Sequence, residues 1–79
     1  MRKVVVIRVR PGGDVKTLAA IVDLQGFRAA CRSSSATGAT ELVCTRRSLF
    51  AIREETFGAK MGGSRFRPYV ESVTFEPAQ

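Results

Sequence analysis

The sequence predicts a single α+β domain built as a sandwich, with a four-stranded antiparallel sheet and two helices on one of its faces. Three observations lead to this prediction. The chain opens with a β-branched run that alternates in polarity, continues with apolar residues at helical spacing, and then carries two short apolar runs around a polar turn. A length of 79 residues fits one domain, residues 1–79, with one core and no linker.

The first predicted strand covers residues 3–9, where β-branched side chains dominate. One face of it holds Lys3, Val5, Ile7 and Val9, and the other holds Arg2, Val4, Val6, Arg8 and Arg10. Pro11-Gly12-Gly13 ends this strand, and Asp14 is placed to cap a helix by accepting free amides of its first turn. The apolar residues of that helix are Val15, Leu18, Ala19 and Val22. Gly26 suits the position after the helix end.

Residues 27–34 and 41–46 predict two strands joined by the polar turn 35–40. A turn centred on Thr37-Gly38 places Cys31 opposite Cys44, and Leu42 opposite Ser33. In this register one face carries Phe27, Ala29, Cys31, Leu42 and Cys44, and the other carries Arg28, Ala30, Arg32, Val43 and Thr45. A slip of one residue would exchange the two faces, so the assignment depends on the turn.

Ser48 predicts the start of a second helix over residues 49–57, with Gly58 after it. Residues 59–67 predict a loop rich in glycine and cations, and residues 69–75 alternate as a last strand. The resulting order β-α-β-β-α-β is that of a ferredoxin-like sandwich.

Thirteen basic and seven acidic residues give a net charge of +6, and ten of the cations are arginine. Such a balance favours polyanions, and arginine binds phosphate with paired hydrogen bonds. Arginine-rich codon usage would produce the same excess, so both explanations stand.

The composition excludes several kinds of chemistry. The chain has no histidine, which is the commonest general base and metal ligand, and its two cysteines lack the spacing of a zinc site. We therefore expect no enzyme activity, no metal and no cofactor. Cys31 and Cys44 would form a bridge or remain small thiols, and a reducing cytosol favours thiols. No apolar run is long enough to span a bilayer, so we expect a cytoplasmic protein with no membrane partner.

The first candidate binding surface is the sheet face opposite the helices, where Arg8, Arg10, Arg28 and Arg32 are predicted to stand together. The architecture resembles that of RNA-recognition-motif domains, which hold single-stranded RNA on an open sheet. Those domains place aromatic residues on the two middle strands, whereas this chain has Val4, Val6, Val43 and Thr45 there. A solvated face, or a homodimer interface that uses the valines, is the alternative.

The second candidate is the loop of residues 60–69, in which Arg65 and Arg67 alternate with Phe66 and Tyr69. Cations interleaved with aromatic rings suit a nucleic-acid strand, although the two rings would equally anchor the loop to the core. The turn Pro11-Gly12-Gly13-Asp14 before a helix resembles the amino-acid-binding region of ACT domains, which implies a small-ligand regulator as a third reading.

The sequence thus predicts a nucleic-acid-binding module that uses Arg8, Arg10, Arg28, Arg32, Arg65, Phe66 and Arg67. The alternative is a protein-interaction module, such as a phage or mobile-element accessory protein or a complex subunit, whose basic patch meets an acidic protein surface.

Overall fold

The computed structural model of the chain describes residues 2–78. Its first two elements, β1 (Lys3–Val9) and α1 (Val15–Leu24), form where the sequence predicts them. Asp14 caps α1, because its carboxylate accepts the backbone amides of Lys16 and Thr17. Gly26 follows the helix with φ +87°, a conformation that glycine adopts without strain.

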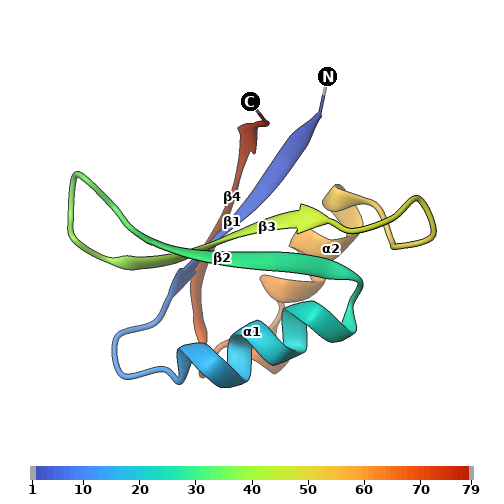
Figure 1. The fold of residues 1–79 in the computed structure, drawn as a ribbon. Helices are drawn as coiled ribbons and strands as arrows, with labels where there is room; N and C mark the ends of the chain where they lie inside the picture. The colour runs from blue at the N-terminus through green and yellow to red at the C-terminus, as the bar shows by residue number, and fades with distance from the viewer. Residues whose placement is uncertain (1, 79) are drawn as a thin grey trace.

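The remaining elements are β2 (Phe27–Ser33), β3 (Thr40–Arg46), α2 (Glu54–Met61), the short 3₁₀ helix η1 (Ser64–Phe66) and β4 (Val70–Pro77). The strands form one antiparallel sheet in the order β2-β3-β1-β4. This confirms the α+β class with four antiparallel strands and two helices. The two chain ends lie side by side, since β1 and β4 pair along their whole length (Figure 1).

The predicted register of the β2–β3 hairpin is wrong by two residues. Cys31 pairs with Leu42, and Cys44 pairs with Ala29, so the two cysteines are not opposed. The reason lies in the turn, which is closed by the Ser34 amide donating to the Ala39 carbonyl and has Gly38 near its end, at φ +73°, instead of at its centre. A shift of two residues preserves the side-chain faces.

The second helix begins five residues later than predicted, and its N-cap is Arg53 instead of Ser48. The Arg46 guanidinium holds the carbonyls of Leu49 and Ala51, which keeps this segment out of a helix. Glu54 and Glu55 then occupy the first turn of α2, where the helix dipole favours carboxylates. The loop predicted over residues 59–67 is also shorter in the structure, because α2 continues to Met61 and η1 covers Ser64–Phe66.

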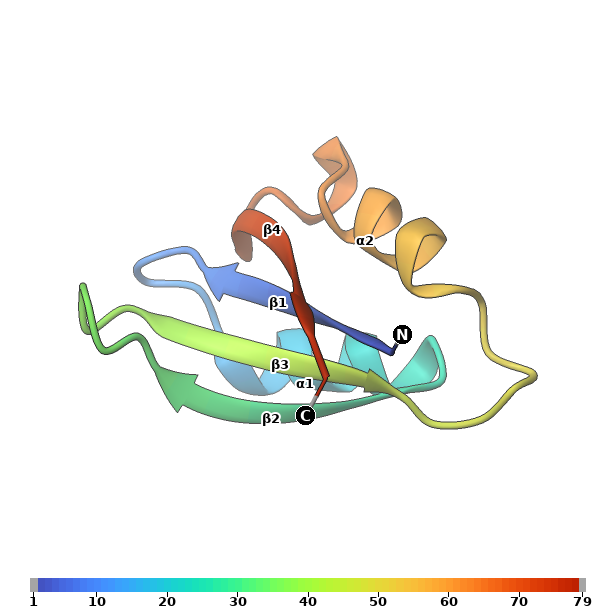
Figure 2. The same ribbon diagram turned by 90° about the horizontal axis from the view of Figure 1, so that it is seen from above.

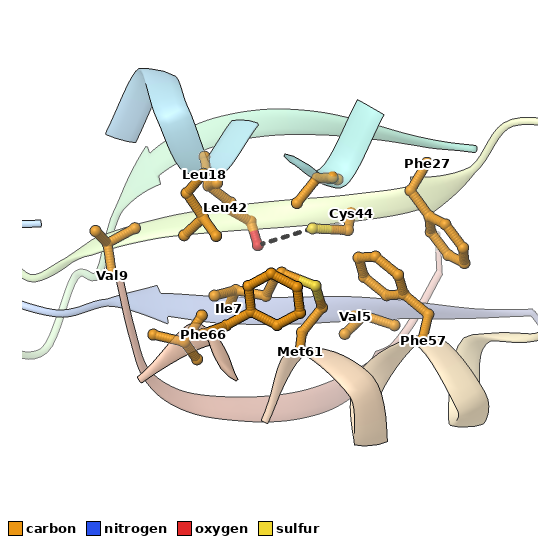
Figure 3. Close-up of a cluster of buried hydrophobic side chains, with 12 residues drawn as sticks. Val5, Ile7, Val9, Leu18, Phe27, Leu42, Cys44, Phe57, Met61 and Phe66 are labelled. Carbon is orange, nitrogen blue, oxygen red and sulfur yellow. Dashed lines mark hydrogen bonds between the residues drawn. The ribbon is translucent and has the colours of Figure 1, made fainter. Parts of the chain in front are cut away.

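The core lies between the two helices and one face of the sheet (Figure 3). Val5 and Ile7 of β1 meet Leu42 and Cys44 of β3, and both helices contribute to the same cluster. The Phe27 and Phe57 rings stack with their centroids 3.9 Å apart and an interplanar angle of 13°. At Gly58 a Cβ would lie 2.5 Å from the Phe75 ring, so α2 approaches β4 closely only because this residue is glycine.

The other side of the sheet carries no helix, and we call it the open face. It holds Arg28, Ala30 and Arg32 of β2, Glu41, Val43 and Thr45 of β3, Val4, Val6 and Arg8 of β1, and Ser72, Thr74 and Glu76 of β4. Figure 2 shows β4 running at a steep angle to β3 across this strongly twisted sheet. The expectation that Val6 on this face is exposed is wrong. Val6 lies between Val43 and Thr74 on the neighbouring strands, and its relative exposure is only 2%.

Candidate functional site

Glu41 organises the charges of the open face. Its side chain is only 10% exposed and forms ion pairs with Arg32, at 3.0 Å, and with Arg8, at 3.4 Å. Arg32 also reaches Glu76 on β4 at 2.8 Å. Hydrogen bonds to Glu76 and then to Glu41 raise the pKa of Arg32 above its ordinary value. Two arginines and two glutamates therefore neutralise one another on this face.

Arg28 is the remaining open-face arginine, and it stands apart from this network. It lies at the start of β2, beside Thr45 and Arg46 at the end of β3. Arg8, Arg28 and Arg32 therefore share the open face as the sequence predicts, but Arg28 stands apart and the other two are already paired. Among its described residues the open face has no aromatic ring on which a base would stack.

The other predicted site residues lie beyond the C-terminal end of β1, next to the segment that precedes β4. Arg10 donates to the backbone carbonyls of Arg67, at 2.7 Å, and of Val70. Phe66 is only 7% exposed and belongs to the core, so its ring is not accessible to a base. Arg65 packs over that ring with its guanidinium carbon 5.9 Å from the centroid. The alternative reading of Phe66, as an anchor for the loop, fits this geometry.

A hollow between α2 and β4 lies beside Arg10 and Arg67. It measures about 560 Å³ and also contains Glu55 and Glu71. Two carboxylates balance the two arginines, so the hollow has no excess of positive charge.

The densest group of cations lies elsewhere, where β2 begins and β3 ends. We call this group the basic end, and it consists of Arg2, Lys3, Arg28, Arg46, Arg47 and Arg53. Five of these residues line a hollow of about 460 Å³ between the first residues of the chain and the β3–α2 connection, and Arg28 lies beside it with Arg46 and Arg47. The carboxylates nearby are Asp23, Glu54 and Glu55. Positive charge is thus in excess at the basic end.

Several of these cations are held in place by the fold. Lys3 pairs with Glu55 at 3.3 Å, Arg47 pairs with Asp23, and Arg46 bonds to backbone carbonyls. The pKa of Glu55 is lowered by a backbone hydrogen bond and then by Lys3. An arginine bonded only to carbonyls keeps its full charge, so Arg46 still attracts anions.

The β3–α2 connection also presents two large apolar side chains to solvent. Leu49 is 87% exposed and Phe50 is fully exposed. The connection projects from the body of the molecule in both ribbon views (Figures 1 and 2). Sequence reasoning placed both residues in a helix over residues 49–57 and so missed this surface.

The structure also bears on the sites that the sequence disfavours. Burial raises the pKa of the Cys44 thiol to about 12, so it stays protonated and unreactive. Across residues 2–78 no group of three potential metal ligands gathers, and no helix of this part is long and apolar enough to cross a membrane. The Asp14 carboxylate at the glycine-rich turn is used for capping.

Comparison with known proteins finds no matching family model, no matching curated protein and no matching solved structure. The function proposed below therefore rests on the geometry of the chain itself.

Proposed function

We propose that this chain is a nucleic-acid-binding module whose contact surface is the basic end. The observation that carries the proposal is the convergence of six cations from four separate segments on one end of the domain. Among residues 2–78, three carboxylates stand near them, so about three of these positive charges remain for phosphates.

Arginine supports this proposal by its chemistry as well as its charge. Five of the six cations are arginine, whose planar guanidinium matches phosphate oxygens with two parallel hydrogen bonds. The proposal differs from the sequence-based one in its residues. Arg28 is common to both, whereas Arg8 contributes only where its pairing with Glu41 is broken, and Arg32 only where its pairs with Glu41 and Glu76 are both broken.

The proposal includes a ferredoxin-like topology and a cytoplasmic location. The strand order β2-β3-β1-β4 supports the topology, since β3 separates β1 from β2 and β1 separates β3 from β4. Each βαβ unit is then split by a strand of the other unit.

Fluorescence anisotropy with a labelled 20-nucleotide oligothymidine tests the function. If about three phosphates are neutralised, raising the salt from 50 to 200 mM weakens binding about 20-fold, because each neutralised phosphate releases a counterion. Binding that ignores salt, or no binding at 50 mM salt, would refute the proposal.

A matched pair of variants tests the location. Arg53→Gln removes one charge from the basic end, and Lys16→Gln removes one from α1, near the other end of the sheet. We expect the first to weaken binding and to lower the salt slope by about 0.7, and the second to change neither. Equal effects of the two variants would show that net charge, and not the basic end, drives binding.

An acidic protein surface is the second candidate partner, and the exposed Leu49 and Phe50 support it. Co-purification before and after nuclease treatment separates the two candidates. A partner protein retained after nuclease treatment favours the protein-interaction function.

A further inference from the structure

The β3–α2 connection presents the aromatic ring of Phe50 to solvent. Phe50 is 100% exposed and its neighbour Leu49 is 87% exposed, whereas the other phenylalanine rings are buried or half-exposed. The two neighbouring side chains form an exposed apolar patch, which is a candidate contact surface.

The connection has a defined conformation that keeps the ring outward. Arg46 donates to the carbonyls of Leu49, at 2.9 Å, and Ala51, at 3.1 Å. The Ser48 hydroxyl accepts the Phe50 amide, and the Ala51 amide donates to the Ser48 carbonyl. Ala51 packs against the core on the inner side. The ring is therefore presented by a fixed turn, which lowers the entropy lost when it binds.

Phe50 directly follows a residue that lines the hollow of the basic end, which we call the basic hollow. Leu49 lines the hollow together with Arg47 and Arg53, and Phe50 is the next residue along the connection. A cationic groove that follows the phosphate backbone, combined with an aromatic ring on which bases stack, is how proteins hold single strands. A concave row of cations also suits a narrow anionic chain better than a flat anionic surface.

From this juxtaposition we propose that Phe50 is a stacking platform for an unpaired base of single-stranded nucleic acid whose phosphates lie in the basic hollow. The inference rests on the proposed function and adds the class of nucleic acid. In a duplex the base faces are already stacked, and a ring reaches them only after a costly unstacking. Phe50 therefore gives the chain a preference for single strands that its charges alone do not provide.

The test compares Phe50→Ala, Phe50→Leu and Phe50→Trp in binding to the 20-nucleotide oligothymidine and to a 20-base-pair duplex. Loss of one stacked base weakens single-strand binding about 5- to 150-fold. We expect this loss for the alanine and leucine variants, with an unchanged salt slope and unchanged duplex binding. The tryptophan variant keeps its affinity, and its fluorescence, unique in a chain without tryptophan, changes on binding. Because Phe50 is fully exposed, all three variants retain the wild-type melting temperature.

The outcomes separate the two proposals. If Phe50→Ala binds the single strand as wild type does while Arg53→Gln binds it more weakly, the stacking inference is wrong and the proposed function stands. Full affinity of Phe50→Leu would also overturn stacking, since leucine keeps the apolar surface without the ring. Absence of wild-type binding to both oligonucleotides at 50 mM salt would remove the proposed function itself.

Discussion

Replacing Glu41 by glutamine should make the open face more basic. The substitution keeps the shape of the side chain and removes the charge that holds Arg8 and Arg32. Arg8 then becomes available to phosphates, whereas Arg32 keeps its ion pair with Glu76. The variant is thus expected to gain binding while losing stability.

The structure sets the size of the stability loss. Glu41 is 8% exposed and accepts bonds from two guanidinium groups. A hydrogen bond to a charged group contributes about 1.5–3 kcal/mol, and glutamine keeps one acceptor oxygen, so we expect a loss of about 1–2 kcal/mol. In a domain of this size that lowers the melting temperature by about 5–15 °C.

The size of the binding gain follows from counterion release. One freed cation that neutralises a phosphate of a single strand raises the magnitude of the salt slope by about 0.7. The assay is anisotropy with the 20-nucleotide oligothymidine between 50 and 200 mM salt, below the melting temperature of the variant. Glu71→Gln is the matched control, because it removes an equal charge from a residue with no ion pair in the described part of the chain. If Glu41→Gln and Glu71→Gln give the same slope, the argument that Glu41 keeps Arg8 from binding phosphate fails.

Three further predictions concern the fold. A thiol reagent should label Cys31 quickly and Cys44 only in denaturant, because Cys44 is buried with a pKa of about 12; two fast thiols per chain would contradict this. Phe57→Ala should lower the free energy of unfolding in urea by about 3–5 kcal/mol, since it removes a fully buried, stacked ring; a loss below about 1 kcal/mol would contradict the core assignment. Asp14→Ala should lower the melting temperature more at pH 7 than at pH 2. The Thr17 hydroxyl lowers the pKa of Asp14, so its stabilisation is present above the ordinary carboxyl pKa and disappears as the pH falls through the lowered value. If Asp14→Ala lowered the melting temperature equally at both pH values, the charge of Asp14 would not be the source of its stabilising effect.

Local signals were sufficient to predict the first third of the fold. The β-branched residues of β1, the Asp14 cap and the apolar spacing of α1 are each decided within a few residues, and all of them form as predicted. The faces of the hairpin were also predicted, because an error of two residues in register leaves them unchanged.

Hydrogen bonds from a side chain to backbone carbonyls decided the start of α2, which the sequence misplaced. Ser48 is a good capping residue, but Arg46 reaches along the chain and holds the carbonyls of Leu49 and Ala51 in a turn. Helix propensity in residues 49–53 was outweighed by these bonds. Nothing in the local pattern of this segment shows that its carbonyls find a partner in a preceding strand.

The candidate site was harder to predict than the fold, because it too depends on which side chains meet after folding. Pairing between Arg8, Arg32 and Glu41 depends on which strands are neighbours, and the basic end gathers residues separated by tens of positions. One local signal was present in the sequence. Two cations, Arg46 and Arg47, are followed within three residues by the large apolar residues Leu49 and Phe50. Such a combination of charge and apolar surface is typical of a contact surface.

Amide chemical-shift mapping tests the location of the site most directly. In a titration of the isotope-labelled chain with the oligothymidine at 50 mM salt, we predict that the largest shifts fall on Arg2, Lys3, Arg28 and residues 46–53. Shifts concentrated instead on Arg10, Arg65 and Arg67, or spread evenly over the surface, would contradict the assignment of the basic end as the nucleic-acid contact.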